Sequence, residues 1–216
     1  MNADYSIPVL LDGAGFQAST IMLCISCIVY TFMRARPDKR QSRIFVCILV
    51  NILITAVCNL VSAFAKPFVT DTFGTAFLVR STFQYIYFVT HILLAPVFCV
   101  YIVLLTGLNY RFTRTRWFLF ITPAVPVFIM ALLNPLTHWV YYFEQNGDYR
   151  RNSGIYALYG VSGVYYITAA VTVLFLWEVL SSKKRKVLVF FLIVVAIGIL
   201  MQLFFSPVHT EDRKSV

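Results

Sequence analysis

The chain has 216 residues, of which 60% are hydrophobic and only 12% are charged, and its formal net charge is +9. Soluble domains carry about 25% charged residues, so this composition excludes an ordinary water-soluble domain and indicates an integral membrane protein. The positive residues occur in short clusters between long apolar runs. That pattern sets the orientation of a membrane protein, and we therefore expect no nucleic-acid binding.

The first apolar run, residues 16–33, predicts a membrane-spanning helix. The first basic residue, Arg34, follows the run, whereas Asp4 and Asp12 precede it. A cleavable secretory signal carries basic residues before its apolar segment. We therefore expect this helix to stay in the membrane, with the N-terminus on the outer side.

The second run, residues 44–65, carries polar residues at spacings of four, four and three, which place them on one face of a helix. They are Asn51, Thr55, Asn59 and Ser62. This face should look into the bundle, since lipid would leave its amides unsatisfied. We interpret it as a surface for hydrogen bonds between helices, with a polar cavity as the alternative.

The third run, residues 79–108, contains Gln84 and His91. Polar and ionisable groups within a membrane helix are candidates for function. His91 therefore has two interpretations: it binds a ligand or carries a proton, or it only bonds to a neighbouring helix.

The fourth run, residues 117–133, is short, and its prolines Pro123 and Pro126 should kink it. It is followed by residues 134–153, the most polar and aromatic stretch between apolar runs. The sequence Asn146-Gly147 predicts a tight turn, and the aromatic-rich segments on either side predict two short strands. Two interpretations stay open: a purely structural hairpin, or a hairpin that also contributes to ligand binding.

The last two runs are residues 155–180 and residues 187–205. In the former, Gly160 and Gly163 should admit a closely packed neighbour. In the latter, Gln202 lies near the outer end.

The odd-numbered connections between the runs are strongly basic, so they should be cytoplasmic. Their basic residues are Arg34, Arg36, Lys39, Arg40, Arg43, Arg111, Arg114, Arg116, Lys183, Lys184, Arg185 and Lys186. Lys66, Asp71 and Arg80 lie around the second connection, which we expect to be external. The predicted fold is an all-α integral membrane bundle of six helices with the N-terminus and the loop 134–153 outside. One domain, residues 1–207, precedes a short polar tail, residues 208–216.

Nothing in the sequence predicts catalysis, a cofactor or a metal site. No helix has a central lysine, and no phosphate-binding loop or catalytic motif occurs. Cys24 and Cys27 share a helix face, but without accompanying His or carboxylate residues we interpret them as packing residues. The candidate ligand-binding residues, gathered at the external side, are Gln84, His91, His138, Trp139, Tyr142, Tyr149, Arg151 and Gln202.

Several short motifs carry a family resemblance. They are Asn134-Pro135, Thr137-His138-Trp139, Tyr142-Phe143, Asn146-Gly147, Tyr149-Arg150-Arg151, Leu104 to Gly107, and Gln202 with Phe204, Phe205 and Pro207. In this pattern, residues 16–207 resemble the N-terminal seven-helix membrane region of bacterial histidine kinases and GGDEF-type diguanylate cyclases. Asn152 and Ser153 depart from the Gly-Pro of that family, and these 216 residues contain neither a seventh span nor an output domain.

The resemblance implies a signal-sensing module in the inner (plasma) membrane of a bacterium. Such a module would bind a small ligand or respond to a membrane cue outside, and would signal to a cytoplasmic kinase or cyclase domain. The expected partners are the lipid bilayer, a small ligand, and a second copy of the chain or another membrane protein. Two alternatives stay open, a small transporter or channel and an assembly partner of another membrane protein.

Overall fold

The computed structural model describes residues 7–34, 40–69, 74–108, 113–144, 147, 149–178 and 180–204, and these are predominantly helical. The elements are α1 (Ile7–Arg34), α2 (Arg40–Ala65), the short 3-10 helix η2 (Lys66–Phe68), α3 (Thr75–Thr106), α4 (Arg114–Ile121), α5 (Ala124–Leu132), α6 (Asn134–Thr137), β1 (Tyr141–Phe143), β2 (Tyr149–Arg151), α7 (Gly154–Phe175) and α8 (Ser182–Phe204). The predicted all-α class is confirmed.

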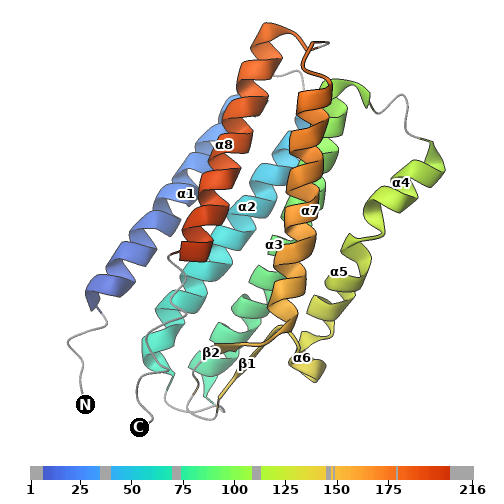
Figure 1. The fold of residues 1–216 in the computed structure, drawn as a ribbon. Helices are drawn as coiled ribbons and strands as arrows, with labels where there is room; N and C mark the ends of the chain where they lie inside the picture. Colours follow the sequence, from blue (N-terminus) through green and yellow to red (C-terminus); the bar gives the residue numbers. More distant parts are fainter. Residues whose placement is uncertain are drawn as a thin grey trace.

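The long helices lie side by side in one bundle (Figure 1). Helix α3 holds a central position, because it packs against α2, α5 and α7, while α1 packs on α2. The β1–β2 hairpin and α6 lie at one end of the bundle, which we call the hairpin end. The first residues of α2, α4 and α8 lie at the opposite end, which we call the basic end because their connections hold the clustered arginines and lysines.

In the part of the chain that the structure describes, four helices are long and apolar enough to cross a membrane. They are α1 over Gly15–Met33, α2 with η2 over Arg40–Phe68, α3, and α7. Helices α4 and α5 together would make a fifth crossing. The prediction of a helical membrane protein therefore agrees with the structure. Six spans stays a prediction, in which the sixth run corresponds to α8.

The predicted fourth span is divided in two. Helices α4 and α5 meet at an angle of 47°. Pro123 and Pro126 explain the break, because each lacks a backbone N–H and together they remove donors from successive turns. The hydroxyl of Tyr165 in α7 donates a 2.7 Å hydrogen bond to the Phe120 carbonyl beside the break. By contrast, α3 continues through Pro96 as one helix of 32 residues.

Two buried clusters lie along the contact between α3 and α7, which we call the α3–α7 seam. The cluster at the hairpin end comprises Phe88, Ile92, Val127, Ala131, Val140, Tyr141, Ile155 and Leu158. The cluster toward the basic end comprises Phe98, Cys99, Ile102, Ala124, Tyr165, Ala169, Val173, Leu180 and Leu188. The same two helices therefore contribute to the core at both ends of the bundle.

Candidate functional site

The polar stretch after α5 forms the hairpin that the sequence predicts. Strands β1 and β2 pair antiparallel, with Tyr141 opposite Arg151 and Phe143 opposite Tyr149. Gly147 has a φ of 80°, a conformation that glycine adopts readily, and its N–H donates to the Glu144 carbonyl at 2.9 Å. The side chains of Glu144 and Arg150 form an ion pair of 2.9 Å on the surface.

Asn134 fixes the start of β1 and is only 2% exposed. Its Oδ1 accepts hydrogen bonds from the backbone N–H groups of Val140 (2.8 Å) and Tyr141 (3.2 Å), and its Nδ2 donates to the Tyr141 carbonyl at 3.1 Å. The backbone N–H of Asn152 donates to the Val140 carbonyl, which therefore points toward β2. Because backbone groups alternate in an antiparallel pair, the N–H and carbonyl of Tyr141 point away from β2. The Asn134 amide therefore supplies the partners that a third strand would otherwise provide.

The base of the hairpin is closed by His138 and the start of α7. His138 ends α6 in the left-handed conformation, with a φ of 55°. Asn152 Nδ2 donates to the His138 carbonyl, and Gly154 N–H donates to the Trp139 carbonyl, both at 2.9 Å. A Cβ at Gly154 would lie 2.5 Å from that carbonyl oxygen, so only glycine fits this contact.

Replacing Gly154 with alanine should destabilise the fold by about 1–3 kcal/mol, because the added methyl meets rigid backbone. Gly160 in the same helix is the matched control, since no described atom lies within 4 Å of a Cβ built there. Gly160→Ala should be neutral or stabilise the helix by up to about 1 kcal/mol. Unfolding of both variants in detergent checks the pair, and equal losses would contradict the packing at Gly154.

Among the described residues of this chain no neighbour packs closely against Gly160 or Gly163, so the close contact expected there stays a prediction. No described atom lies within 4 Å of a Cβ built at either position. Small residues in a membrane helix favour close contacts only where another backbone meets them, and here that contact occurs at Gly154.

Arg80 ties the tip of the hairpin to α3. It lies within α3, inside the third apolar run and not in the connection before it, and its side chain is 8% exposed. Its Nη1 donates a 2.7 Å hydrogen bond to the Gly147 carbonyl, and its guanidinium carbon lies 5.4 Å from the centroid of the Phe143 ring. Gly147 in turn sits against Val69, whose Cγ1 would be 2.5 Å from an added Cβ. The hydrogen bond and the ring contact of Arg80, together with the packing of Gly147 against Val69, thus hold the tip of the hairpin on the bundle.

Stacked aromatic rings fill the space between the hairpin and α3. The Phe88 ring stacks on Tyr141 at a centroid distance of 4.8 Å and also on Tyr149 at 6.4 Å. Phe143 meets Phe77 edge to face at 5.2 Å. Burial raises the pKa of Tyr141 to about 12, so its hydroxyl stays neutral at physiological pH. This layer is packed core, and one of its members, Tyr149, also belongs to the candidate site beside it.

Next to this layer lies a group of residues from three elements that we call the tyrosine–arginine cluster. It comprises Tyr87 and His91 of α3, Tyr149 and Arg151 of β2, and Tyr159 of α7. The Tyr87 and His91 rings are stacked at 5.4 Å with an interplanar angle of 11°. The Arg151 side chain and, more weakly, the other two tyrosines act electrostatically on the Tyr149 hydroxyl. Burial raises the pKa of Tyr149, while Arg151 acts in the opposite direction, so the phenol is neutral beside an exposed guanidinium.

Of the predicted ligand residues, Tyr149 and Arg151 are neighbours in this cluster, and His91 joins them through Tyr87, on whose ring it stacks. Two residues that sequence reasoning had not assigned to ligand binding, Tyr87 and Tyr159, complete it. Tyr87 precedes His91 by four residues, a spacing at which side chains on a helix are neighbours, and this signal could have identified it.

The other predicted ligand residues lie elsewhere. His138, Trp139 and Tyr142 are exposed on the outside of the hairpin. Gln84 accepts a 3.0 Å hydrogen bond from Ser62 and so belongs to the α2–α3 contact. Gln202 falls in α8, but its side chain lies outside the described residues.

The predicted polar face of α2 lies at the α2–α3 contact. The hydroxyls of Thr55 and Thr90 are 3.2 Å apart, and Ser62, about two turns further along α2, donates a hydrogen bond to Gln84. The Thr55 hydroxyl also donates to the backbone carbonyl of Asn51, and Asn59 is half-buried on the same helix. The bonds of Thr55 and Ser62 to α3 are interhelical hydrogen bonds, whereas the bond between Thr55 and Asn51 lies within α2.

The cluster offers phenol hydroxyls, an imidazole and one guanidinium, and among its five members there is no carboxylate. In the described part of the chain, no three His, Cys, Asp or Glu residues come together in a way that could hold a metal ion. The chemistry that remains is hydrogen bonding, aromatic stacking and attraction of a negative charge.

Comparison with known proteins adds no identity to this geometry: no family model, no curated protein and no solved structure matches the chain.

Proposed function

We propose that this chain is the membrane-embedded sensing module of a bacterial receptor, with the hairpin end outside and the basic end in the cytoplasm. The tyrosine–arginine cluster carries the proposal, because three separate elements meet there around groups suited to a ligand. The basic connections at the opposite end support the orientation through the positive-inside rule. The motif resemblance to the membrane regions of histidine kinases and diguanylate cyclases supports the receptor role.

The proposed ligand is a small organic anion that carries a ring. Arg151 is exposed and would pair with a carboxylate, to which a guanidinium can donate two parallel hydrogen bonds. The Tyr87 and His91 rings, which stack on each other and are half-buried, would provide aromatic contacts, and Tyr149 and Tyr159 would provide hydroxyls.

Signal transfer would follow the α3–α7 seam. A ligand in the cluster touches α3 through His91, α7 through Tyr159, and β2 through Arg151. A shift between α3 and α7 would then reach Cys99 and Ala169, which are fully buried in the second cluster toward the basic end. Packed interfaces of this kind favour discrete arrangements, and a ligand that prefers one of them changes the populations. The output domain would lie beyond these residues.

Thermal unfolding of the full chain in lipid nanodiscs tests the site. We expect benzoate, in large excess over its dissociation constant, to raise the unfolding temperature by about 5 °C, because a ligand bound only to the folded state stabilises it. Benzamide, which lacks the charge, and acetate, which lacks the ring, should act more weakly.

A matched pair of arginine variants separates specific binding from general charge. Arg151→Gln should abolish the benzoate-induced shift in unfolding temperature. Arg150→Gln changes the adjacent residue of the same strand, which pairs with Glu144, and should retain the shift. If the two variants lose the benzoate-induced shift in unfolding temperature equally, the proposed anion site is ruled out. The same holds if neither benzoate nor acetate shifts the unfolding temperature of the wild-type chain.

The receptor role has its own test, which is the reading frame beyond the codon for Val216. A further apolar span followed by a kinase or GGDEF domain would support the role. Specific solute flux through liposomes containing the chain would instead favour a transporter.

A further inference from the structure

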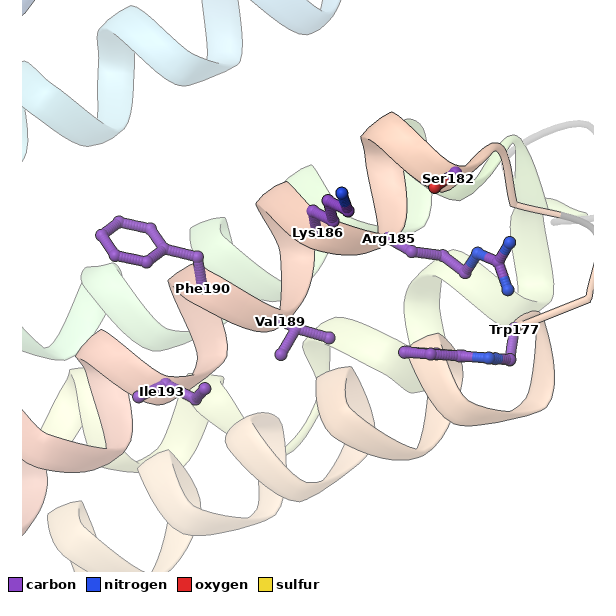
Figure 2. A pocket seen from close by; sticks show the side chains of 7 residues that line it. All are labelled: Trp177, Ser182, Arg185, Lys186, Val189, Phe190 and Ile193. Carbon is purple, nitrogen blue, oxygen red and sulfur yellow. The ribbon is translucent and has the colours of Figure 1, made fainter.

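A groove lies at the basic end, where the turn after α7 faces the first turns of α8. Its volume is about 420 Å³. It is lined by Trp177, Ser182, Arg185, Lys186, Val189, Phe190 and Ile193, and Figure 2 shows these side chains on α8 and the adjoining turn. None of these residues belongs to the tyrosine–arginine cluster at the opposite end.

Apart from Trp177, which lies in the turn after α7, the lining residues form the outward face of α8. The opposite face holds the helix on the bundle: Leu188 is 1% exposed, the Tyr166 hydroxyl donates to the Leu192 carbonyl at 2.8 Å, and Lys184 Nζ donates to the Leu105 carbonyl at 3.2 Å. On the groove side, Phe190 is 65% exposed and Ile193 is 52% exposed. Around a membrane protein, such a face meets lipid rather than water.

The two ends of the groove differ in chemistry. Near the start of α8, the Arg185 guanidinium carbon lies 5.4 Å from the Trp177 ring, with Ser182 and Lys186 on the same helix face. Figure 2 shows Arg185 extended over the Trp177 indole and Val189 directed into the space beside α7. One or two turns further along, the lining is wholly apolar, through Val189, Phe190 and Ile193.

We propose that this groove binds an anionic phospholipid. Arg185, Lys186 and Ser182 would hold the headgroup phosphate, because a guanidinium and a hydroxyl both donate to phosphate oxygens and the ammonium adds charge. An acyl chain would lie along Val189, Phe190 and Ile193. Trp177 stands between the two regions, at the level of the membrane interface that tryptophan favours.

Charge complementarity selects this occupant over a second copy of the chain. The first turns of α2 and α4 begin at the same end as the groove and carry Arg40, Arg43, Arg114 and Arg116, so the local field attracts anionic headgroups. A symmetric pair of chains meeting through this surface would bring together two cationic patches, and their repulsion opposes such a contact.

Fluorescence of Trp177 in nanodiscs containing the full chain tests the proposal. The substitutions Trp117→Phe and Trp139→Phe leave Trp177 as the single reporter. Brominated acyl chains quench a nearby indole, so phosphatidylglycerol with brominated chains should reach half-maximal quenching at about a tenfold lower mole fraction than brominated phosphatidylcholine, given the attraction of two cations.

Paired charge variants locate the effect. The double substitution Arg185→Gln and Lys186→Gln should remove the preference for phosphatidylglycerol, and Arg185→Lys, which keeps the cation, should retain most of it. Arg114→Gln with Arg116→Gln removes two cations from α4 at the same end and should leave the preference unchanged.

Three results would overturn the proposal. The first is equal quenching by the two lipids in the wild-type chain. The second is an equal loss of preference in the α4 and α8 double variants, which would indicate a diffuse field. The third is protection of Trp177 from both lipids as the protein-to-lipid ratio rises, which would indicate that a second copy covers the groove.

Discussion

Replacing Asn134 with alanine should destabilise the protein by about 3 kcal/mol or more, because three buried backbone groups lose their partners and each unsatisfied group costs roughly 1–3 kcal/mol. The groups are the N–H of Val140 and both the N–H and the carbonyl of Tyr141. Val140 is fully buried and Tyr141 is 4% exposed, so water cannot readily take over these bonds. Chemical unfolding in detergent micelles measures the loss.

Two control variants show whether the Asn134 amide itself is responsible. Asn152→Ala removes another hairpin asparagine, whose side chain is exposed, and should cost about 1 kcal/mol. Asn134→Asp keeps the acceptor for the two N–H groups but loses the donor to the Tyr141 carbonyl, so its cost should fall between the other two. If the alanine variants of Asn134 and Asn152 are equally stable, the Asn134 amide does not replace the hydrogen bonds that a third strand would provide.

Arg80→Ala should have a comparable effect, a loss of about 2–4 kcal/mol, because a hydrogen bond from a charged group and a cation–π contact disappear together. The Gly147 carbonyl would lose its donor from α3, and Phe143 would lose the guanidinium beside it. The tip of the hairpin should then separate from α3 more often. Hydrogen exchange of the β1 and β2 amides should accelerate, and global unfolding should shift in the same direction.

Arg150 provides the matched control for Arg80. It lies on the same hairpin, but its ion pair with Glu144 is 36% exposed on both sides, and exposed pairs contribute at most about 1 kcal/mol. Arg150→Ala should therefore leave hydrogen exchange in the hairpin nearly unchanged. Equal acceleration in the two variants would mean that Arg80 does not anchor the tip.

Much of the fold could be predicted because membrane segments follow simple rules. Continuous apolar runs predicted the helices, the Asn146-Gly147 turn with its flanking aromatics predicted the hairpin, and two close prolines predicted the kink of the fourth run. The ends of the helices were harder to predict from the sequence: α7 ends at Phe175, whereas the predicted run ends at residue 180. The apolar residues beyond Phe175 form a turn, and hydrophobicity alone does not distinguish a turn at a membrane surface from more helix.

The candidate site was harder to predict because its members come from distant parts of the chain. His91, Tyr149 and Arg151 are predicted as polar residues at the external side; in the structure Tyr149 and Arg151 are neighbours, and His91 is linked to them through Tyr87. Arg80 was missed as an anchor because a lone arginine beside an apolar run resembles an interfacial charge. Its role depends on the Gly147 carbonyl, 67 residues later, and the sequence pattern of neither residue indicates that contact.

The length of α3 has a mechanical consequence. Its 32 residues extend over about 48 Å, whereas the hydrocarbon layer of a bilayer is about 30 Å thick. The helix must therefore protrude from the layer or tilt within it, and the balance changes with bilayer thickness. Since Arg80 attaches the hairpin tip to the first turns of α3, a change in the tilt of α3 should carry the hairpin with it. We therefore expect a change in bilayer thickness to move Tyr149 and Arg151 of β2 relative to the hydrocarbon layer, even when no small molecule is bound.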